Sequence, residues 1–140
     1  ISVMNLGRLA QITNRDQLRQ SAGRTLAVFA SRLSVAPMAL PQLLGAGEFV
    51  VGQPREIILA GHRDSAAMQA LLRELHQRFV PNRVVLMVDS PEAVQALAPG
   101  IPSIESMQPV EGRASAYVCR DYTCQLPVSE PSKFAELIQY

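Results

Sequence analysis

Apolar side chains in the first quarter of the chain recur with the spacing of an amphipathic helix. They follow one another at steps of three or four residues: Leu18, Ala22, Leu26, Phe29 and Leu33. This period places them on one face of a helix, with arginines at the other positions. Asn14 is a suitable N-cap because its side-chain oxygen can accept a hydrogen bond from the first turn. The stripe is therefore expected to lie in a core.

Further helices are predicted on both sides of this one. Residues 1–10 have a helical pattern from the start, which suggests that the chain is a fragment of a larger protein. Another helix is predicted from Pro37 to Val51, with Pro41 still inside its first turn and Gly52 closing it. Together these patterns predict antiparallel helical hairpins.

The hydrophobic period changes at Gln53 and Pro54. Residues 56–60 and 83–88 are short, nearly all-apolar runs typical of buried strands. The apolar face of the predicted helix between them consists of Met68, Leu71, Leu72, Leu75 and Phe79. Two such strands joined by one helix form a βαβ unit with parallel pairing and a right-handed crossover.

The remaining elements are shorter. The pattern predicts a helix over 91–97 capped by Ser90, followed by a long loop over 98–113. It then predicts a strand over 114–119 and a candidate strand over 125–128. A last helix is predicted after 131, with Phe134, Leu137 and Ile138 facing inward. The fold class is therefore α/β. A helical segment spans residues 1–52, and a small mixed sheet with a parallel βαβ unit spans residues 53–140.

Composition and charge exclude several classes of function. A net charge of +1, with basic residues scattered among acidic ones, gives no basic surface for nucleic acid. No apolar run approaches the roughly 20 residues that cross a membrane, so no membrane partner is expected. Two cysteines in 140 residues do not form a secreted disulfide framework. A reducing, cytoplasmic location and no cofactor are the resulting expectations.

The two cysteines, Cys119 and Cys124, are the residues that say most about the chemistry the chain could perform. If residues 120–123 form a four-residue hairpin loop, the cysteines face each other with Cβ atoms about 4.5–5.5 Å apart, somewhat beyond the roughly 3.8 Å of a disulfide. We expect a structural pair of reduced thiols, with Cys119 partly buried and on the same face as Tyr117. A bridge formed on oxidation, a redox-catalytic pair and half of a metal site remain alternatives.

A zinc site needs four protein ligands, or three and a water. The candidate ligands are Cys119, Cys124, His62 and His76. His76 is expected on the surface of the βαβ helix, and His62 in the loop after the first strand. Solvated histidines are the simpler interpretation, so no metal is expected.

The loop over residues 61–65 precedes a helix N-terminus, where an anion can bind. His62, Arg63 and Asp64 are therefore weak ligand-site candidates, and Asp89 and Ser90 after the next strand would line the same edge. The loop has one glycine and matches neither dinucleotide-binding nor P-loop motifs. Ordinary helix capping is the simpler interpretation.

The tail resembles a known family. The resemblance rests on residues 116–119 (Ala-Tyr-Val-Cys), 124–125 (Cys-Gln), 127–128 (Pro-Val) and 130–131 (Glu-Pro), with support from residues 36–44, 55–59 and 81–85. These look like the carboxyl end of the spermatogenesis-associated protein 20 family, which includes YyaL-like, thioredoxin-domain-containing proteins of unknown function. The resemblance implies an amino-terminal thioredoxin-like domain and an α/α barrel outside this chain, with residues 1 to about 51 as the last barrel helices.

Two functional hypotheses follow. The first is a non-catalytic segment that caps the barrel of the parent protein and serves intramolecular docking or self-association. Its partners would be the missing amino-terminal part of the parent and further copies of itself. The second is an accessory lobe of a sugar- or thiol-handling enzyme whose main site lies elsewhere, with His62, Arg63 and Asp64 as contributing residues.

Overall fold

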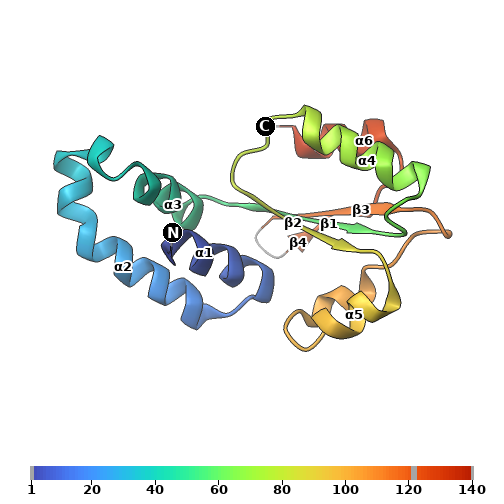
Figure 1. Ribbon diagram of the computed structural model, residues 1–140, viewed down its shortest axis with the longest axis horizontal. Helices are drawn as coiled ribbons and strands as arrows, with labels where there is room; N and C mark the ends of the chain where they lie inside the picture. Colours follow the sequence, from blue (N-terminus) through green and yellow to red (C-terminus); the bar gives the residue numbers. More distant parts are fainter. Residues whose placement is uncertain (1, 121–122, 140) are drawn as a thin grey trace. The chain divides into compact units, whose positions relative to one another are not determined.

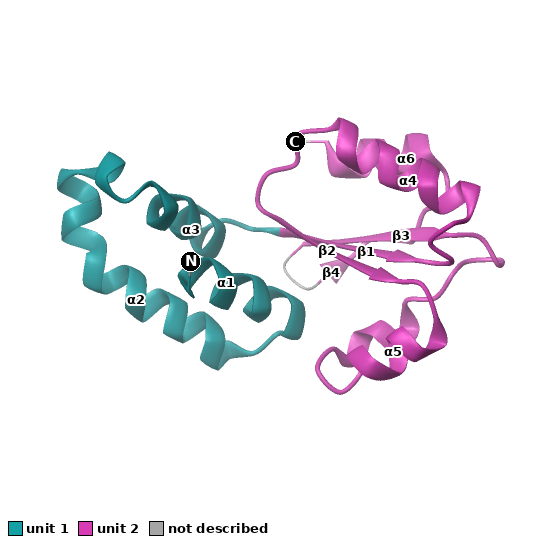
Figure 2. Cartoon of the chain, in the orientation of Figure 1, with its two compact units in different colours: residues 1–54 teal, residues 55–140 magenta. Residues whose placement is uncertain are grey.

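The computed structural model describes residues 2–120 and 123–139. The chain divides into two compact units, residues 1–54 and 55–140 (Figure 2). The division therefore falls after Pro54, close to the change of hydrophobic period.

The first unit is helical (Figure 1). Its elements are α1 (Ser2–Thr13), α2 (Asp16–Val35), the 3-10 helix η1 (Pro37–Ala39) and α3 (Pro41–Val51). Its small core contains Val3, Ala22 and Ala46, packed against half-buried Met4, Leu6, Leu26, Leu43 and Val50. Helices α1 and α3 approach closely at Gly7, where an added Cβ would lie 2.9 Å from Val50 Cγ2. Glycine at this position thus permits the packing of the two helices.

Two helix boundaries differ from those predicted. Asn14 does not cap α2: it has a φ of 51° in the turn after α1, and Arg15 is the N-cap without a side-chain hydrogen bond. Asn tolerates this left-handed conformation better than most residues, which favours the turn over the cap. The helix predicted from Pro37 is interrupted at Leu40, and α3 begins at Pro41. The residue before a proline avoids the helical conformation, which explains the break.

The apolar stripe of α2 is covered only in part. Ala22 is buried and Leu26 is half-buried, but Phe29 is 39% exposed. Val28 and Val35, beside the stripe, are 76% and 87% exposed. The prediction that the whole stripe lies in a core was therefore wrong, since Ala22 is the buried residue of α2 among those described.

The second unit combines a mixed sheet with helices. Its described elements are β1 (Arg55–Ala60), α4 (Ala66–Gln77), β2 (Arg83–Val88), α5 (Pro91–Leu97), the 3-10 helix η2 (Pro102–Ser106), β3 (Ser115–Arg120), β4 (Thr123–Cys124) and α6 (Pro131–Ile138). The strand order is β2-β1-β3-β4, with β1 parallel to β2 and antiparallel to β3. The predicted α/β class and the parallel βαβ unit are confirmed.

Helices α4 and α6 cover one face of this sheet, and α5 lies on the other side (Figure 1). The larger core forms under α4 and α6, and its fully buried members include Ile57, Leu59, Met68, Leu71, Ala116, Phe134 and Ile138. Because side chains alternate along a strand, Glu56, Ile58 and Ala60 point to the opposite face. Ile58 and Ala60 are also fully buried there. A strand buried on both faces explains why residues 57–60 are uniformly apolar.

Three predictions for this unit need correction. Phe79 lies beyond the end of α4 and is 88% exposed, so it does not belong to the core face. The predicted loop over 98–113 contains η2, which buries Ile104. The strand expected over 125–128 is instead β4 at 123–124, followed by an isolated bridge between Ala116 and Val128.

Candidate functional site

The cysteine hairpin lies at one edge of the sheet. Cys119 on β3 and Cys124 on β4 are directly paired, and Arg120 pairs with Thr123. Arg120 and Thr123, which the prediction put in a four-residue loop over 120–123, are therefore strand residues; residues 121 and 122 lie outside the described residues. The facing arrangement of the cysteines is confirmed by this register.

A disulfide joins Cys119 and Cys124, and no described cysteine is free. The expectation of two reduced thiols was therefore wrong for this structure. The reason is geometric: the two Cα atoms are 3.9 Å apart, nearer than the roughly 4.5 Å between Cα atoms of an ordinary non-hydrogen-bonded antiparallel pair. The backbone bond from Gln125 N–H to the Val118 carbonyl belongs to the neighbouring pair, so the cysteines occupy a non-hydrogen-bonded, closer pair.

The hairpin is asymmetric in exposure. Cys119 is 1% exposed, whereas Cys124 is exposed. As predicted, Cys119 shares a face with Tyr117, whose hydroxyl donates a hydrogen bond of 2.6 Å to the Gln108 carbonyl. The bridge closes a loop with a sequence separation of only 5. In the chain-entropy account such a short loop stabilises the fold by about 2 kcal/mol.

Glu56 is an acidic residue that the sequence predictions did not single out. Its side chain lies next to the bridge. Glu56 is directly opposite Cys119 in the β1–β3 register and is only 7% exposed. Burial raises the pKa of the Glu56 carboxyl from 4.5 to about 7. The signal was present in the sequence, since Glu56 is an acidic residue directly before the apolar run of residues 57–60.

The neighbouring Arg55 does not neutralise Glu56 across the strand. Its guanidinium donates hydrogen bonds of 2.8 Å and 2.6 Å to the carbonyls of Ile138 and Gln139, at the end of α6. Since α6 covers the other face of the sheet, the two adjacent charges point in opposite directions. The Glu56 carboxyl therefore stays in a poorly solvated environment on the cysteine face.

The ligand-site candidates at the strand ends lie at the expected edge of the sheet. Their polar groups form hydrogen bonds or ion pairs with one another or with the backbone. Arg63 Nε lies 3.3 Å from Asp89 Oδ2, in a pair that is largely exposed on the arginine side. His62 Nδ1 accepts a bond of 3.3 Å from the Asp64 backbone N–H. His62, Arg63 and Asp64 are all exposed.

Two serines at this edge cap helices. Ser65 Oγ accepts from Met68 N–H at the start of α4, and Ser90 Oγ accepts from Ala93 N–H at the start of α5. The predicted cap at Ser90 is confirmed, and of the two alternatives for α4, Asp64 and Ser65, the cap is Ser65. Both hydroxyls are thus engaged in local structure, as the capping interpretation requires.

Gly61 positions this edge. Its φ is 132°, and an added Cβ would lie 2.9 Å from the Cα of Ala114. Its N–H also donates to the Val88 carbonyl at 2.9 Å, which continues the β1–β2 pairing by one residue. A glycine is therefore needed where β1 turns toward the loop.

The described residues contain no group of three or more His, Cys, Asp or Glu side chains that could hold a metal ion. His62 and His76 are exposed, and the cysteine sulfurs are bonded to each other rather than available as thiolates. The structure does not bring the four candidate ligands together.

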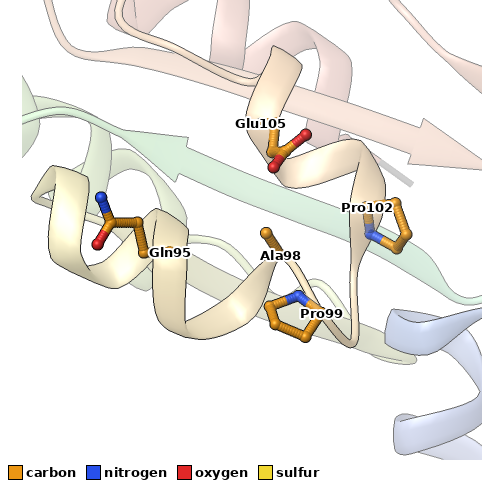
Figure 3. A pocket seen from close by; sticks show the side chains of 5 residues that line it. All are labelled: Gln95, Ala98, Pro99, Pro102 and Glu105. Atoms are coloured by element: carbon orange, nitrogen blue, oxygen red, sulfur yellow. The ribbon is translucent and has the colours of Figure 1, made fainter.

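One surface pocket of about 420 Å³ lies beside α5 and η2 (Figure 3). It is lined by Gln95, Ala98, Pro99, Pro102 and Glu105. These side chains supply one carboxylate and one amide, and none of the strand-end candidates contributes to it. Among the residues that the structure describes, no helix has both the length and the apolarity needed to cross a membrane.

Comparison with known proteins supports the resemblance in the tail. Spermatogenesis-associated protein 20 of Homo sapiens is 26% identical over 138 residues, which is 99% of this chain and 17% of that protein. The chain is a homologue of spermatogenesis-associated protein 20. The protein of that name in Rattus norvegicus is 25% identical over the same coverage.

A more distant organism gives a similar result. An uncharacterized protein of Caenorhabditis elegans is 29% identical over 147 aligned residues, covering 98% of this chain and 18% of that protein. The chain therefore spans about one sixth of the length of the curated relatives it matches. No protein-family model matches the chain, and no solved structure does.

Proposed function

We propose that this chain is a non-catalytic, carboxyl-terminal module of a larger protein, and that its helical unit docks on the preceding part of that protein. The observation that carries the proposal is the apolar surface of the first unit. Large hydrophobic side chains are exposed on α2, η1 and α3: Val28, Phe29, Val35, Met38, Leu44 and Val51. We call this set the helical docking surface.

The surface includes a groove. An apolar pocket of about 380 Å³ between α2 and α3 is lined by Leu33, Leu44, Gly47, Glu48 and Val51. Val51 is 83% exposed and Leu44 is 46% exposed, so the groove lies open rather than filled by the unit itself. Exposed apolar patches of this kind mark interaction sites on soluble domains.

The length of the relatives suggests the occupant. The chain accounts for 17% of spermatogenesis-associated protein 20, so a much longer stretch of polypeptide accompanies the homologous segment there. The family resemblance in the tail implies a helical barrel before this segment. Helices pack side by side through apolar ridges and grooves, so an apolar helix face in that part of the parent protein is the kind of partner that the docking surface fits. The proposal includes capping of a barrel end by this unit and a cytoplasmic parent protein.

Self-association is the expected behaviour of the chain when it is separated from that partner. Covering the docking surface with a second copy removes the same apolar side chains from water. Sedimentation velocity on the isolated chain should therefore show dimers or larger species. A monodisperse monomer at high concentration would contradict the proposal.

In the most direct binding test, the remainder of the parent protein is expressed separately and its affinity for this chain is measured. Val35→Lys and Val51→Lys place a charge on the docking surface near helix C-termini, where a cation is compatible with the helix. We expect each to weaken binding at least about tenfold. The matched control is Phe79→Lys in the second unit, because Phe79 is as exposed, at 88%. Equal affinities for all three variants and the unaltered chain would refute the docking surface.

A further inference from the structure

The cysteine bridge is built so that one sulfur can be reached and the other is protected. Cys124 lies on the exposed two-residue strand β4, whereas Cys119 is 1% exposed on β3. A thiol arriving from solvent therefore has access to the Cys124 side of the bond. In thiol–disulfide exchange, attack on one sulfur releases the other as a thiolate. Attack at Cys124 would release the thiolate of Cys119 inside the protein.

A buried acid faces the place where that thiolate forms. Glu56 is the register partner of Cys119, and residues directly opposite in an antiparallel pair have Cβ atoms about 4.5–5.5 Å apart. Burial raises the pKa of the Glu56 carboxyl to about 7, so the carboxyl is partly protonated near neutral pH. A buried thiolate is costly to form without a proton donor nearby.

The other described side chains of the strands on this face supply no second carboxyl group, and the acidic residues of α5 and η2, Glu92 and Glu105, are exposed. Across β2, the partner of Glu56 is Val84, followed by Leu86 on the same face. On β3, the titratable neighbour is Tyr117, whose hydroxyl already donates to the Gln108 carbonyl. The nearest charged residue in the strand, Arg55, is bound to carbonyls at the end of α6 on the opposite face.

The strand pairing at the hairpin has backbone hydrogen bonds besides the bridge. Beyond the cysteines, Gln125 N–H donates to Val118 at 3.0 Å, and Ala116 and Val128 exchange two backbone bonds of 2.8 Å and 3.0 Å. The ladder from β3 therefore continues past the hairpin through hydrogen bonds alone. A bridge that closes so short a loop constrains the unfolded chain less than a long-range one. The hairpin can thus keep its pairing when the disulfide opens.

From this geometry we propose that Cys119 and Cys124 form a reversible dithiol–disulfide exchange site for dithiol reductants, in which Glu56 transfers the proton of Cys119. In the reducing direction, one thiolate of the dithiol attacks Cys124 Sγ and forms a mixed disulfide. The Cys119–Cys124 bond breaks, and Cys119 Sγ takes a proton from the Glu56 carboxyl. The second thiol of the reductant loses its proton to water and, as a thiolate, attacks the reductant's own sulfur in the mixed disulfide, while the Glu56 carboxylate regains a proton from water.

The second attack releases Cys124 as a thiolate, which takes a proton from water. The reductant leaves as a cyclic disulfide, and its two electrons now reside in the two cysteine thiols. In the reverse direction the Glu56 carboxylate accepts the proton of Cys119, and the thiolate displaces the bound thiol. The net reaction exchanges one disulfide for another, so bonds and electrons balance without a further co-reactant.

The test measures the rate at which dithiothreitol reduces the native chain, read by alkylation and mass spectrometry, from about pH 6 to about pH 9. Each rate is divided by the concentration of dithiothreitol thiolate at that pH. The normalised rate of the unaltered chain should fall as pH rises through about 7, where Glu56 loses its proton. A normalised rate that is flat across this range would overturn the proposal, and so would a bridge that opens only after denaturation.

Variants separate a proton-transfer role from a structural one. Glu56→Gln keeps the size of the side chain but cannot donate a carboxyl proton, so the normalised rate at about pH 6 should drop at least fivefold and lose its dependence on pH. Glu56→Asp retains the acid and should restore the pH dependence. If Glu56→Gln reduces as fast as the unaltered chain, or Glu56→Asp is as flat as Glu56→Gln, the assignment of Glu56 is wrong.

Discussion

Burial of Glu56 predicts that the stability of the second unit falls as pH rises toward neutrality. The carboxyl has a pKa of 4.5 when exposed and about 7 in the folded chain. Between these values the folded state holds a proton that the unfolded state has lost. The stability that protonated Glu56 confers is therefore complete below about pH 4.5 and is lost as pH rises through 7.

The size of this change in stability follows from the pKa shift of Glu56. One pKa unit corresponds to about 1.36 kcal/mol, so the rise of the Glu56 pKa from 4.5 to about 7 gives an upper bound of about 3 kcal/mol. Some contact with water remains, because Glu56 is 7% exposed, and screening reduces the effect. We expect Glu56→Gln to raise the free energy of unfolding by about 1–3 kcal/mol at pH 8 and to change it little at pH 4.5.

Urea unfolding followed by far-UV circular dichroism is a suitable assay, because the chain contains no tryptophan. The disulfide stays intact throughout, so that exchange does not complicate the transition. Glu92→Gln is the matched control. The Glu92 backbone N–H and then the Ser90 hydroxyl lower the pKa of that carboxyl, so it titrates below the window. If Glu56→Gln leaves the slope of the free energy of unfolding against pH unchanged between pH 5 and pH 8, the Glu56 carboxyl is solvated and the reasoning fails.

Two further predictions concern the edge of the sheet and can be checked by the same unfolding measurement. Gly61→Ala should destabilise the chain by about 1–3 kcal/mol, because its Cβ would meet the backbone of Ala114 at a φ of 132°; an unchanged stability would contradict the close approach. Ser65→Ala should cost about 0.5–2 kcal/mol through loss of the α4 cap, whereas Arg63→Ala, which removes only an exposed ion pair, should stay within about 1 kcal/mol. Equal losses from the two would argue against the capping role of Ser65.

Much of the fold could be predicted because its signals are local. Periodicity placed β1, β2 and the helix between them, and buried strands with a short helical crossover pair in parallel for steric reasons. The helix boundaries at Asn14 and Leu40 were missed, since a left-handed turn and the residue before Pro41 compete with helix signals that look the same in sequence. Phe29 was misplaced because a periodic stripe shows which face is apolar, not what covers it.

The candidate site was only half predictable. The facing of Cys119 and Cys124 followed from their spacing, but whether they bridge depends on tenths of an ångström in strand separation. Glu56 became important only through a partner 63 positions further along the chain, at Cys119, and no local pattern indicates a cross-strand neighbour so distant. His62, Arg63 and Asp64 had the composition of a ligand loop, yet the structure leaves them exposed and engaged in local contacts.

The central claim, that the helical unit docks on the preceding part of the parent protein, is tested most directly by carbene footprinting of side chains. The labelling of Val35, Met38 and Val51 should be high in the isolated chain at low concentration, where they are 87%, 80% and 83% exposed. In the complete parent protein their labelling should fall severalfold, while that of Phe79 stays unchanged. Equal labelling of the three docking residues in both proteins would contradict the account.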